Sequence, residues 1–242
     1  MDSEFSRIKL LIEPRQFDAL RNSSVMVIGC GGVGAMCIES LARMGVGNLI
    51  LVDHDVVSVT NINRQVHALH QTANQKKIDV MKQRVLDIQP SCQVITLDMF
   101  INQDNLHVLD DYDIDVIVDA IDTVTSKLLC IQYAQARGID IVSCMGMGNR
   151  MDPTKVQVVP LRKTNTDPLA KVMRYECRKR GIDDTIMVVS SLEVPIKQNR
   201  RLSDSKILKE AQPPASSSFV PMAAGLACGY QVVNYIIEKR CL

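Results

Sequence analysis

The sequence predicts an α/β fold in which helices cover both faces of a doubly wound, mostly parallel sheet. Short apolar runs of strand length alternate with segments of helical spacing through the first part of the chain. A glycine-rich turn joins the first strand to the first long helical segment, as in nucleotide-binding α/β proteins. The chain has 242 residues, of which 46% are hydrophobic, so it is long enough to bury a large core.

The first part of the chain, residues 1–152, is expected to hold an N-terminal helical arm and the alternating elements. We expect strands near Val25, Leu49, Val94, Val116 and Ile139, with helices near Ala35, Ile78 and Ser126 between them. This alternation indicates a parallel sheet, because parallel neighbours are joined by crossovers that usually contain a helix.

The second part, residues 153–242, is expected to be a C-terminal extension fused to the same domain. It should add strands near Val156 and Met187, a basic helix near Ala170, and an apolar helix from Met222 to Ile237. The segment from Val194 to Ser218 contains three prolines and a serine run. It is long for a loop in a compact domain, so we expect it to be functional or mobile.

The first strand–helix turn is a candidate phosphate-binding loop. The apolar run Val25–Ile28 is followed by four glycines, Gly29, Gly31, Gly32 and Gly34. Glycines let the backbone turn tightly and approach a phosphate, whose charge is favoured by the free N–H groups of the following helix. The pattern does not identify the nucleotide, and a tight turn without a ligand is the alternative.

An acidic residue follows the second strand. Asp53 comes directly after the run Leu49–Val52, nineteen residues after Gly34. At about this spacing, dinucleotide enzymes place an acid on a ribose hydroxyl, so an NAD-dependent oxidoreductase is a reasonable alternative. Asp55 is a further candidate nucleotide ligand at the same strand end.

The residues after Asp53 favour a triphosphate over a nicotinamide cofactor. Asn61 and Arg64 lie close behind the strand end, and Lys77 opens the next helical segment. A hydride-transfer site needs no cation there, whereas a triphosphate does, because a guanidinium matches phosphate oxygens in a fixed fork. Lys77 alone is typical of a solvated lysine at a helix start, but together with Arg64 it becomes a second candidate phosphate ligand.

The fourth strand, Asp115–Val118, runs into the sequence DAID. An acid at the carboxyl end of a strand, close to phosphates, is suited to holding Mg²⁺ through its oxygens. We assign the metal to Asp122, because Asp119 is also a candidate cap for the next helix, as are Thr123 and Thr125.

Together these motifs resemble the ThiF/MoeB/HesA superfamily, whose adenylation domains are similar to those of ubiquitin-activating enzymes. The loop GCGGVG matches the GxGGxG pattern of the superfamily, and NINRQ at residues 61–65 matches its N-x-x-R-Q element. Within it the chain is most similar to dehydratases of threonylcarbamoyladenosine in tRNA, through INRQVHAL, MGMGNRMDPTK, DPLAKVMR and SSFVP. The resemblance covers nearly the whole chain and implies a Rossmann-like fold.

The resemblance also implies the roles of individual residues. It places ATP with its ribose on Asp53, its phosphates on the glycine loop, Arg64 and Lys77, and Mg²⁺ on Asp122. Arg7, in the sequence FSR, matches an arginine that reaches into the ATP site of the other subunit of a homodimer. Arg64, Lys77, Asp122 and Arg7 are therefore the expected catalytic residues.

The implied reaction adenylates the carboxylate of N6-threonylcarbamoyladenosine in tRNA and cyclises it, with release of AMP and pyrophosphate. The alternative is an adenylyltransferase that activates the C-terminal glycine of a ubiquitin-like sulfur-carrier protein. A sulfur-transfer or carrier protein is accordingly a possible partner. Many relatives that activate such carriers hold a structural zinc with two C-x-x-C pairs, but this chain has none, so no zinc is expected.

Cysteines do not provide a convincing nucleophile. Cys177 is surrounded in sequence by basic residues, which would lower the pKa of an exposed thiol, and Cys241 is next to the last residue. We interpret both as buried or incidental thiols, since the intramolecular cyclisation implied by the resemblance needs no enzyme nucleophile. Two departures from the family concern Glu13–Pro14, where a glycine is common, and Cys144, where a small hydroxyl residue is common.

Charge is informative only when the chain is divided. The whole chain carries a net charge of +1, but residues 162–209 hold twelve basic and six acidic residues, a net charge of +6. The basic residues gather at Arg174, at residues 178–180, and at Lys197, Arg200 and Arg201. A phosphate-backbone surface for tRNA is one interpretation, and a solvated helix face and loop is the other. No run of eighteen apolar residues and no signal-peptide core is present, so we expect a cytoplasmic enzyme without a membrane segment.

Overall fold

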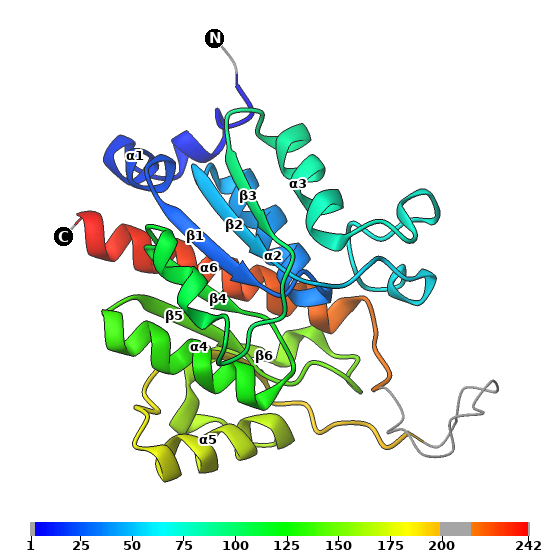
Figure 1. The fold of residues 1–242 in the computed structure, drawn as a ribbon. Coiled ribbons are helices and arrows are strands. Elements are labelled where there is room, and N and C mark those ends of the chain that lie inside the picture. Colours follow the sequence, from blue (N-terminus) through cyan, green and yellow to red (C-terminus); the bar gives the residue numbers. More distant parts are fainter. Residues whose placement is uncertain (1–2, 199–213, 242) are drawn as a thin grey trace.

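A computed structural model describes residues 3–198 and 214–241 and arranges them around a seven-stranded sheet (Figure 1). The strands are β1 (Ser24–Ile28), β2 (Asn48–Val52), β3 (Gln93–Leu97), β4 (Val116–Asp119), β5 (Asp140–Cys144), β6 (Val156–Pro160) and β7 (Met187–Ser191). Their spatial order is β3-β2-β1-β4-β5-β7-β6. Every neighbouring pair is parallel except β6 and β7, which confirms the predicted mostly parallel sheet.

Six α-helices cover the sheet in the described part of the chain. They are α1 (Pro14–Arg21), α2 (Gly32–Met44), α3 (Lys77–Ile88), α4 (Val124–Arg137), α5 (Pro168–Arg180) and α6 (Phe219–Cys241). Helices α1, α2, α3 and α6 pack on one face, and α4 and α5 pack on the other (Figure 1). This is the doubly wound architecture that the sequence predicts.

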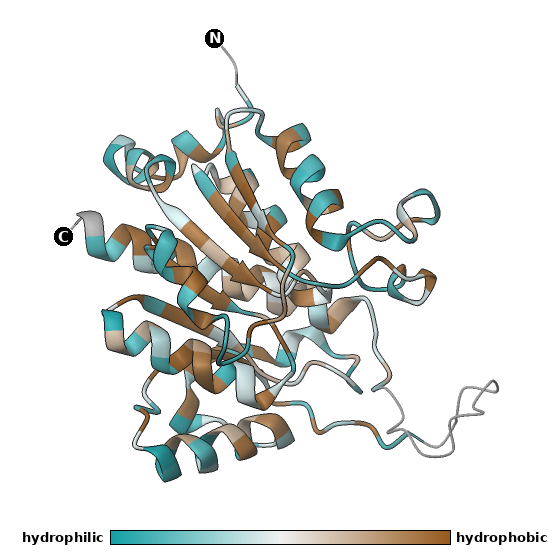
Figure 2. Ribbon diagram, viewed as in Figure 1, coloured by the Kyte–Doolittle hydropathy of each residue, from teal (hydrophilic) through white to brown (hydrophobic). Residues whose placement is uncertain are grey.

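Alternate side chains of each central strand point to opposite faces of the sheet. In β1, Val25 and Val27 belong to the core beneath α2 and α6, whereas Met26 and Ile28 belong to the core beneath α4 and α5. Both sets are buried, so the central strands are mainly apolar, as Figure 2 shows. The continuous apolar runs in the sequence are therefore a direct consequence of a sheet covered on both sides.

The N-terminal arm ends in a short helix whose start explains one departure from the family pattern. Glu13 is the N-cap of α1, and Pro14 occupies its first position, where the missing N–H group costs no helical hydrogen bond. The Glu13 carboxylate and the Gln16 side chain complete a reciprocal capping box. The Glu13–Pro14 sequence thus begins a helix.

The two parts of the chain that meet near Asp152 share this one sheet. Strand β7 lies between β5 from the first part and β6 from the second. The final helix α6 returns to pack along α2, next to the glycine loop (Figure 1). By length and composition alone, Phe219–Lys239 could cross a membrane, but half of its apolar window is buried inside the protein. Such burial is typical of a core helix in an α/β domain.

The predicted long loop is described only at its two ends, which contain neither helix nor strand. Residues 199–213 lie outside the described residues, and with them the basic positions Arg200 and Arg201 that the charge argument used.

Candidate active site

A cavity of about 510 Å³ opens at the carboxyl ends of the strands. Its walls come from the turns after β1, β4 and β5, the segments after β2 and β3, and the start of α3. In parallel α/β sheets, ligands bind at this end. Among the predicted nucleotide-binding residues, all but Gly34 line the cavity: Gly29, Gly31, Gly32, Asp53, Asp55, Asn61, Arg64, Lys77 and Asp122.

The glycine loop brings the start of α2 to the cavity. Gly29 has a φ of +96°, and a Cβ atom there would lie 2.8 Å from the carbonyl oxygen of Ala120. A Cβ atom on Gly34 would lie only 1.7 Å from the carbonyl oxygen of Gly29, so Gly34 lets the helix approach the strand end. The N–H groups of the first turn of α2 have no partner within the helix, and this end attracts an anion.

Asp53 joins the second strand to the glycine loop. The side chain is nearly buried, and its two carboxylate oxygens accept the N–H groups of Cys30 at 2.6 Å and Asp55 at 2.8 Å. Each oxygen keeps a second lone pair for another donor, such as a hydroxyl group of a ligand. Asp53 therefore fixes the shape of the loop as well as lining the cavity.

Lys77 is held in place by an ion pair at the wall of the cavity. Its ammonium nitrogen lies 2.6 Å from a carboxylate oxygen of Asp55, and its side chain is only 7% exposed. An ammonium group has three protons, so two remain available to an anion in the cavity. The alternative of a solvated lysine at a helix start is therefore wrong.

Two further donors stand on the short helical turn η2 (Val59–Asn61) and the residues after it. The side-chain oxygen of Asn61 accepts the N–H of Ser58 at 3.0 Å. Arg64 donates one terminal nitrogen to the carbonyl oxygen of Thr60 at 2.8 Å and to the side chain of Asn63 at 2.9 Å. Its Nε and second terminal nitrogen have no partner among the described residues, which leaves one edge of the guanidinium fork for a ligand.

Asp122 lines the cavity on the turn between β4 and α4. Its carboxylate has no hydrogen bond or ion pair with any residue that the structure describes. Nearby, ligand atoms of Asp53, His54 and Asp55 lie within 4.8 Å of one another, but Asp55 is already paired with Lys77. An unpartnered carboxylate suits a hard cation such as Mg²⁺ better than one already paired with an ammonium group.

Of the three candidate caps for α4, the structure has Thr123 at the N-cap position and not Asp119 or Thr125. The N-cap of α4 is Thr123, whose side chain makes no capping bond, while Asp119 is wholly buried and bonded to Lys127 at 3.0 Å. The Lys127 ammonium also donates to Ser143 at 3.2 Å and to the carbonyl oxygen of Cys144 at 2.7 Å. This network, which the sequence analysis missed, joins the ends of β4 and β5 behind the cavity. The only signal for it is a lysine inside the apolar stretch of α4.

Arg7 lies far from the cavity of its own chain. It immediately precedes the short helical turn Ile8–Leu10, and its side chain is exposed. The neighbouring Phe5 packs against Gly45, at the end of α2 opposite the glycine loop. Because α2 has 13 residues, about 20 Å of helix separates the Phe5 contact from the glycine loop. The structure therefore does not bring Arg7 together with the other expected catalytic residues.

The basic residues of helix α5 differ in their surroundings. Arg178, Lys179 and Arg180 are exposed, whereas Arg174 is half-buried and donates to the carbonyl oxygen of Thr164 at 2.8 Å. Cys177 is buried on the other side of the helix, and loss of hydration, reinforced by Asp184, raises the pKa of its thiol to about 11. This burial agrees with the interpretation of Cys177 as an incidental thiol; the Cys241 side chain lies outside the described residues.

Comparisons with known proteins extend over nearly the whole chain. The model of the ThiF family matches residues 5–236. The tRNA threonylcarbamoyladenosine dehydratase of Bacillus subtilis (strain 168) is 43% identical over 97% of this chain and 95% of its own length. Two crystal structures of the E. coli tRNA N6-threonylcarbamoyladenosine dehydratase each cover 98% of this chain and 95% of their own. The complex with ATP has a TM-score of 0.88 at 28% identity, and the complex with AMP a TM-score of 0.89 at 30% identity.

Proposed function

The chain belongs to the ThiF family, and from this premise we propose that it is a tRNA threonylcarbamoyladenosine dehydratase. The enzyme uses ATP to adenylate the carboxylate of N6-threonylcarbamoyladenosine in tRNA and then cyclises the product. The observation that carries this proposal is the cavity itself, in which a glycine loop, two cationic side chains and an unpartnered carboxylate line one pocket. Full-length similarity to a dehydratase supports the substrate.

ATP would enter with its phosphates at the start of α2. The free N–H groups of that helix turn, the open edge of Arg64 and the remaining protons of Lys77 supply donors to phosphate oxygens. Asp53 would accept hydroxyl groups of the ribose, and Asn61 offers its side-chain amide beside the phosphates. These groups are fixed before the ligand arrives, so they stabilise charge on the transferring phosphoryl group without rearranging.

Asp122 would hold Mg²⁺ close to the phosphates, where the ion neutralises phosphate charge. The fit rests on its unpartnered carboxylate at the wall of the cavity.

The reaction needs no covalent bond to the protein. A carboxylate oxygen of the substrate forms a bond to the α-phosphorus, the bond to the β-phosphate bridge breaks, and pyrophosphate leaves. The carbamoyl group of the same substrate then attacks the activated carbonyl carbon, the bond to AMP breaks, and one carbamoyl N–H proton is released. The protein contributes positioning and electrostatic stabilisation. The buried cysteines at positions 30, 144 and 177 are consistent with a reaction of this kind.

Arg7 completes the site from the second subunit of a homodimer. Its position at the far end of α2 prevents it from acting in its own chain. A mixture of Arg7→Ala and Arg64→Ala proteins would form some dimers with one intact composite site. We expect such mixed dimers to recover activity that neither variant shows alone. Verified mixed dimers without activity would contradict the role of Arg7.

The substrate tRNA would contact the exposed basic face of α5, with Arg178, Lys179 and Arg180 against the phosphate backbone. Such an enzyme works in the cytoplasm, where tRNA is modified. A sulfur-transfer protein remains a candidate additional partner.

A direct assay tests the function against its alternatives. The protein is incubated with ATP and labelled pyrophosphate, and then with threonylcarbamoyl-modified tRNA, with a ubiquitin-like carrier protein, or with neither. We expect AMP release with modified tRNA only. Exchange with the carrier would instead support activation of its C-terminal glycine, and hydride transfer without ATP would support an oxidoreductase. Arg64→Ala and Asp122→Ala should each abolish AMP release while the protein stays folded, and full activity of either would refute its role.

A further inference from the structure

One wall of the cavity is not used by the proposed nucleotide contacts. It consists of residues 144–148 after β5, with Leu169 at the start of α5, and Pro214, Ser216 and Pro221 from the C-terminal part. Its side chains are mainly apolar or absent, and it carries none of the acidic or basic ligands described above. The residues Met145–Gly148 are called here the β5 wall.

The β5 wall carries backbone donors without acceptors. The N–H of Met145 donates to Val189 at 2.8 Å, and that of Asn149 donates to Ala215 at 2.6 Å. Between them, the N–H groups of Gly146, Met147 and Gly148 donate to no acceptor among the described residues. Successive backbone N–H groups without an acceptor in the protein form a concave set of donors, so three in succession at a cavity suit a ligand that accepts hydrogen bonds.

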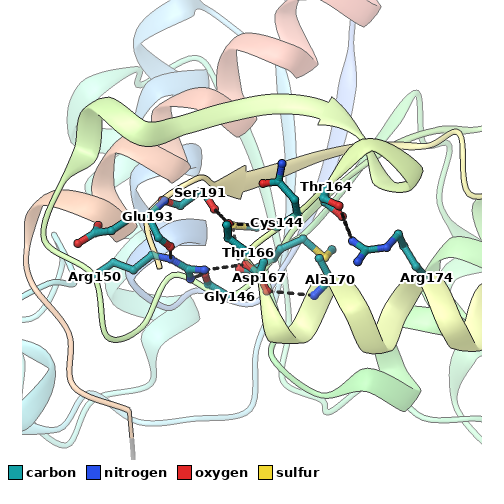
Figure 3. Close-up of polar contacts among 12 residues, drawn as sticks. Cys144, Gly146, Arg150, Thr164, Thr166, Asp167, Ala170, Arg174, Ser191 and Glu193 are labelled. Atoms are coloured by element: carbon teal, nitrogen blue, oxygen red, sulfur yellow. Dashed lines mark hydrogen bonds and ion pairs between the residues drawn. The ribbon is translucent and has the colours of Figure 1, made fainter. Parts of the chain in front are cut away.

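A buried arginine fixes the direction of one of these donors, the N–H of Met147. The Arg150 guanidinium donates to the carbonyl oxygen of Gly146, to the carboxylate of Asp167 at 3.3 Å, and to the carbonyl oxygen of Glu193 at 3.0 Å (Figure 3). Arg150 is only 2% exposed and does not line the cavity. Since a trans peptide directs its C=O and N–H groups to opposite sides, the N–H of Met147 points away from Arg150.

The support beneath the wall is itself held rigidly. The Asp167 carboxylate caps α5 by accepting the N–H of Ala170 at 3.0 Å. Directly before it, Thr166 has a φ of +56°, a strained value for a β-branched residue, and its hydroxyl bonds to Ser191 at 3.1 Å. Figure 3 shows these groups drawn together from the segments after β5 and β7 and from the start of α5. Strain of this kind persists only where the surroundings determine it.

Asn149 closes the other end of the wall. Besides donating to Ala215, it accepts the N–H of Ala215 through its side chain at 2.9 Å and the N–H of Ile196 through its carbonyl oxygen at 2.7 Å. Asn149 also adopts a positive φ of 59°. The β5 wall is thus tied down at both ends, with Arg150 beneath it.

We propose that the β5 wall is the subsite for the acyl substrate, and that its backbone N–H groups receive the oxygens of the threonylcarbamoyl group. Arg150 is the positioning residue, because it holds the peptide that carries the N–H of Met147. This inference rests on the proposed function and adds the place where the acyl group binds. Its carboxylate would face the α-phosphate, and the same donors would stabilise the negative oxygen that forms when the carbamoyl group attacks the activated carbonyl.

A stable mimic of the acyl-adenylate isolates this subsite from the nucleotide site. The probe is 5′-O-sulfamoyladenosine acylated on its sulfamate with N-carbamoylthreonine, and AMP is the reference ligand that lacks the acyl part. Calorimetric titration measures both dissociation constants without tRNA or turnover. We expect wild-type protein to bind the probe at least tenfold more tightly than AMP. Equal binding of the two would overturn the proposal.

Two variants test the wall. Arg150→Lys keeps a positive charge near Asp167 but cannot make the three directed bonds of the guanidinium. Gly148→Ala would place its Cβ atom 2.8 Å from a side-chain carbon of Pro214, which must displace the wall. Each variant should bind the probe at least tenfold more weakly than wild type, and its dissociation constant for AMP should stay within twofold of wild type. Equal losses for both ligands, or unchanged probe binding, would refute the assignment.

Arg84→Lys is the matched control, because it makes the same change in an arginine that pairs with Glu39, away from the cavity. It should leave the ratio of probe to AMP affinity unchanged, and a changed ratio would refute the specificity of the Arg150 effect. Failure of this subsite and failure of the proposed function can be told apart. If wild-type protein releases no AMP with modified tRNA, the dehydratase assignment is refuted, whatever the binding of the probe.

Discussion

Replacing Gly34 by alanine should separate α2 from the end of β1. A Cβ atom at this position would stand 1.7 Å from the carbonyl oxygen of Gly29, whereas ordinary contact begins at 3.4 Å. The neighbour is backbone, so it cannot rotate away, and the helix must move by about 1.7 Å, the difference between these two distances. The change therefore disturbs the strand–helix junction that carries the phosphate-binding N–H groups.

The cost follows from overpacking in a close-packed interior. Such substitutions destabilise by about 1–3 kcal/mol, and the better helix propensity of alanine offsets up to about 1 kcal/mol. For a protein of this size, about 1 kcal/mol corresponds to roughly 2–4 °C in the unfolding midpoint. We expect a midpoint lowered by several degrees and an ATP affinity lowered about tenfold or more, because the displaced N–H groups no longer meet the phosphates.

Gly31→Ala is the matched control. It is in the same loop with a φ of −78°, and a Cβ atom there would meet no protein atom within 4 Å. Its unfolding midpoint should stay within about a degree of wild type, since surface changes usually cost less than about 0.5 kcal/mol. Thermal unfolding and ATP titration of both variants give the comparison. The packing argument fails if Gly34→Ala keeps the wild-type midpoint and ATP affinity.

Three other perturbations have defined outcomes. Lys127→Met should lower the free energy of unfolding, measured in urea, by about 3–5 kcal/mol, because it leaves the Asp119 carboxylate buried without its ion pair. A loss below about 1 kcal/mol would contradict this. His67 is buried, and neither of its ring nitrogens has a hydrogen-bond partner among the described residues. Burial is the main cause that lowers its pKa to about 4, and the positive charge of Lys77 adds to it. As pH falls from 6.5 to about 4, the histidine is protonated in the unfolded protein before it is protonated in the folded protein. The free energy of unfolding should therefore drop by up to about 3 kcal/mol in that window. His67→Leu should flatten this dependence on pH, and an unchanged slope would exclude His67 as its source. Cys177 should resist iodoacetamide at pH 7.5 until urea unfolds the protein, and rapid labelling of the folded form would contradict its burial.

Much of the fold and the nucleotide site could be predicted because their signals are local. The strands are continuous apolar runs since both faces of the sheet are covered, and each run is bounded by a turn. Asp53, Arg64, Lys77 and Asp122 could be placed at the cavity because each follows, or opens the helix after, an expected strand. In a parallel sheet, that position along the chain fixes a position in space.

The parts that could not be predicted depend on contacts between distant segments. Arg150 and Asp167 are separated by 17 residues, and β6 lies between them in the chain. The burial of Lys127 likewise requires the ends of β4 and β5 to lie side by side. Arg150 and Asp167 each fall in a motif of the dehydratase subgroup, but neither motif indicates that the two side chains pair. Lys127 is marked only by its place in an apolar stretch.

The position of Arg7 shows a different limit of sequence reasoning. The residue matches a family motif, but the fold alone puts it at the wrong end of α2 for its own site. Its expected role depends on a second molecule, and one sequence carries no information on where that molecule sits.

Asn149 has a consequence for how this protein can vary. It bonds to both Ile196 and Ala215, so the two described ends of the segment from Val194 to Ser218 meet at a single residue. Because these ends are held together, lengthening the eighteen residues between Ile196 and Ala215 adds little to the entropic cost of closing the loop, about 0.6 kcal/mol for each doubling. Insertions, deletions and changes of charge can accumulate there while the catalytic chamber keeps its geometry.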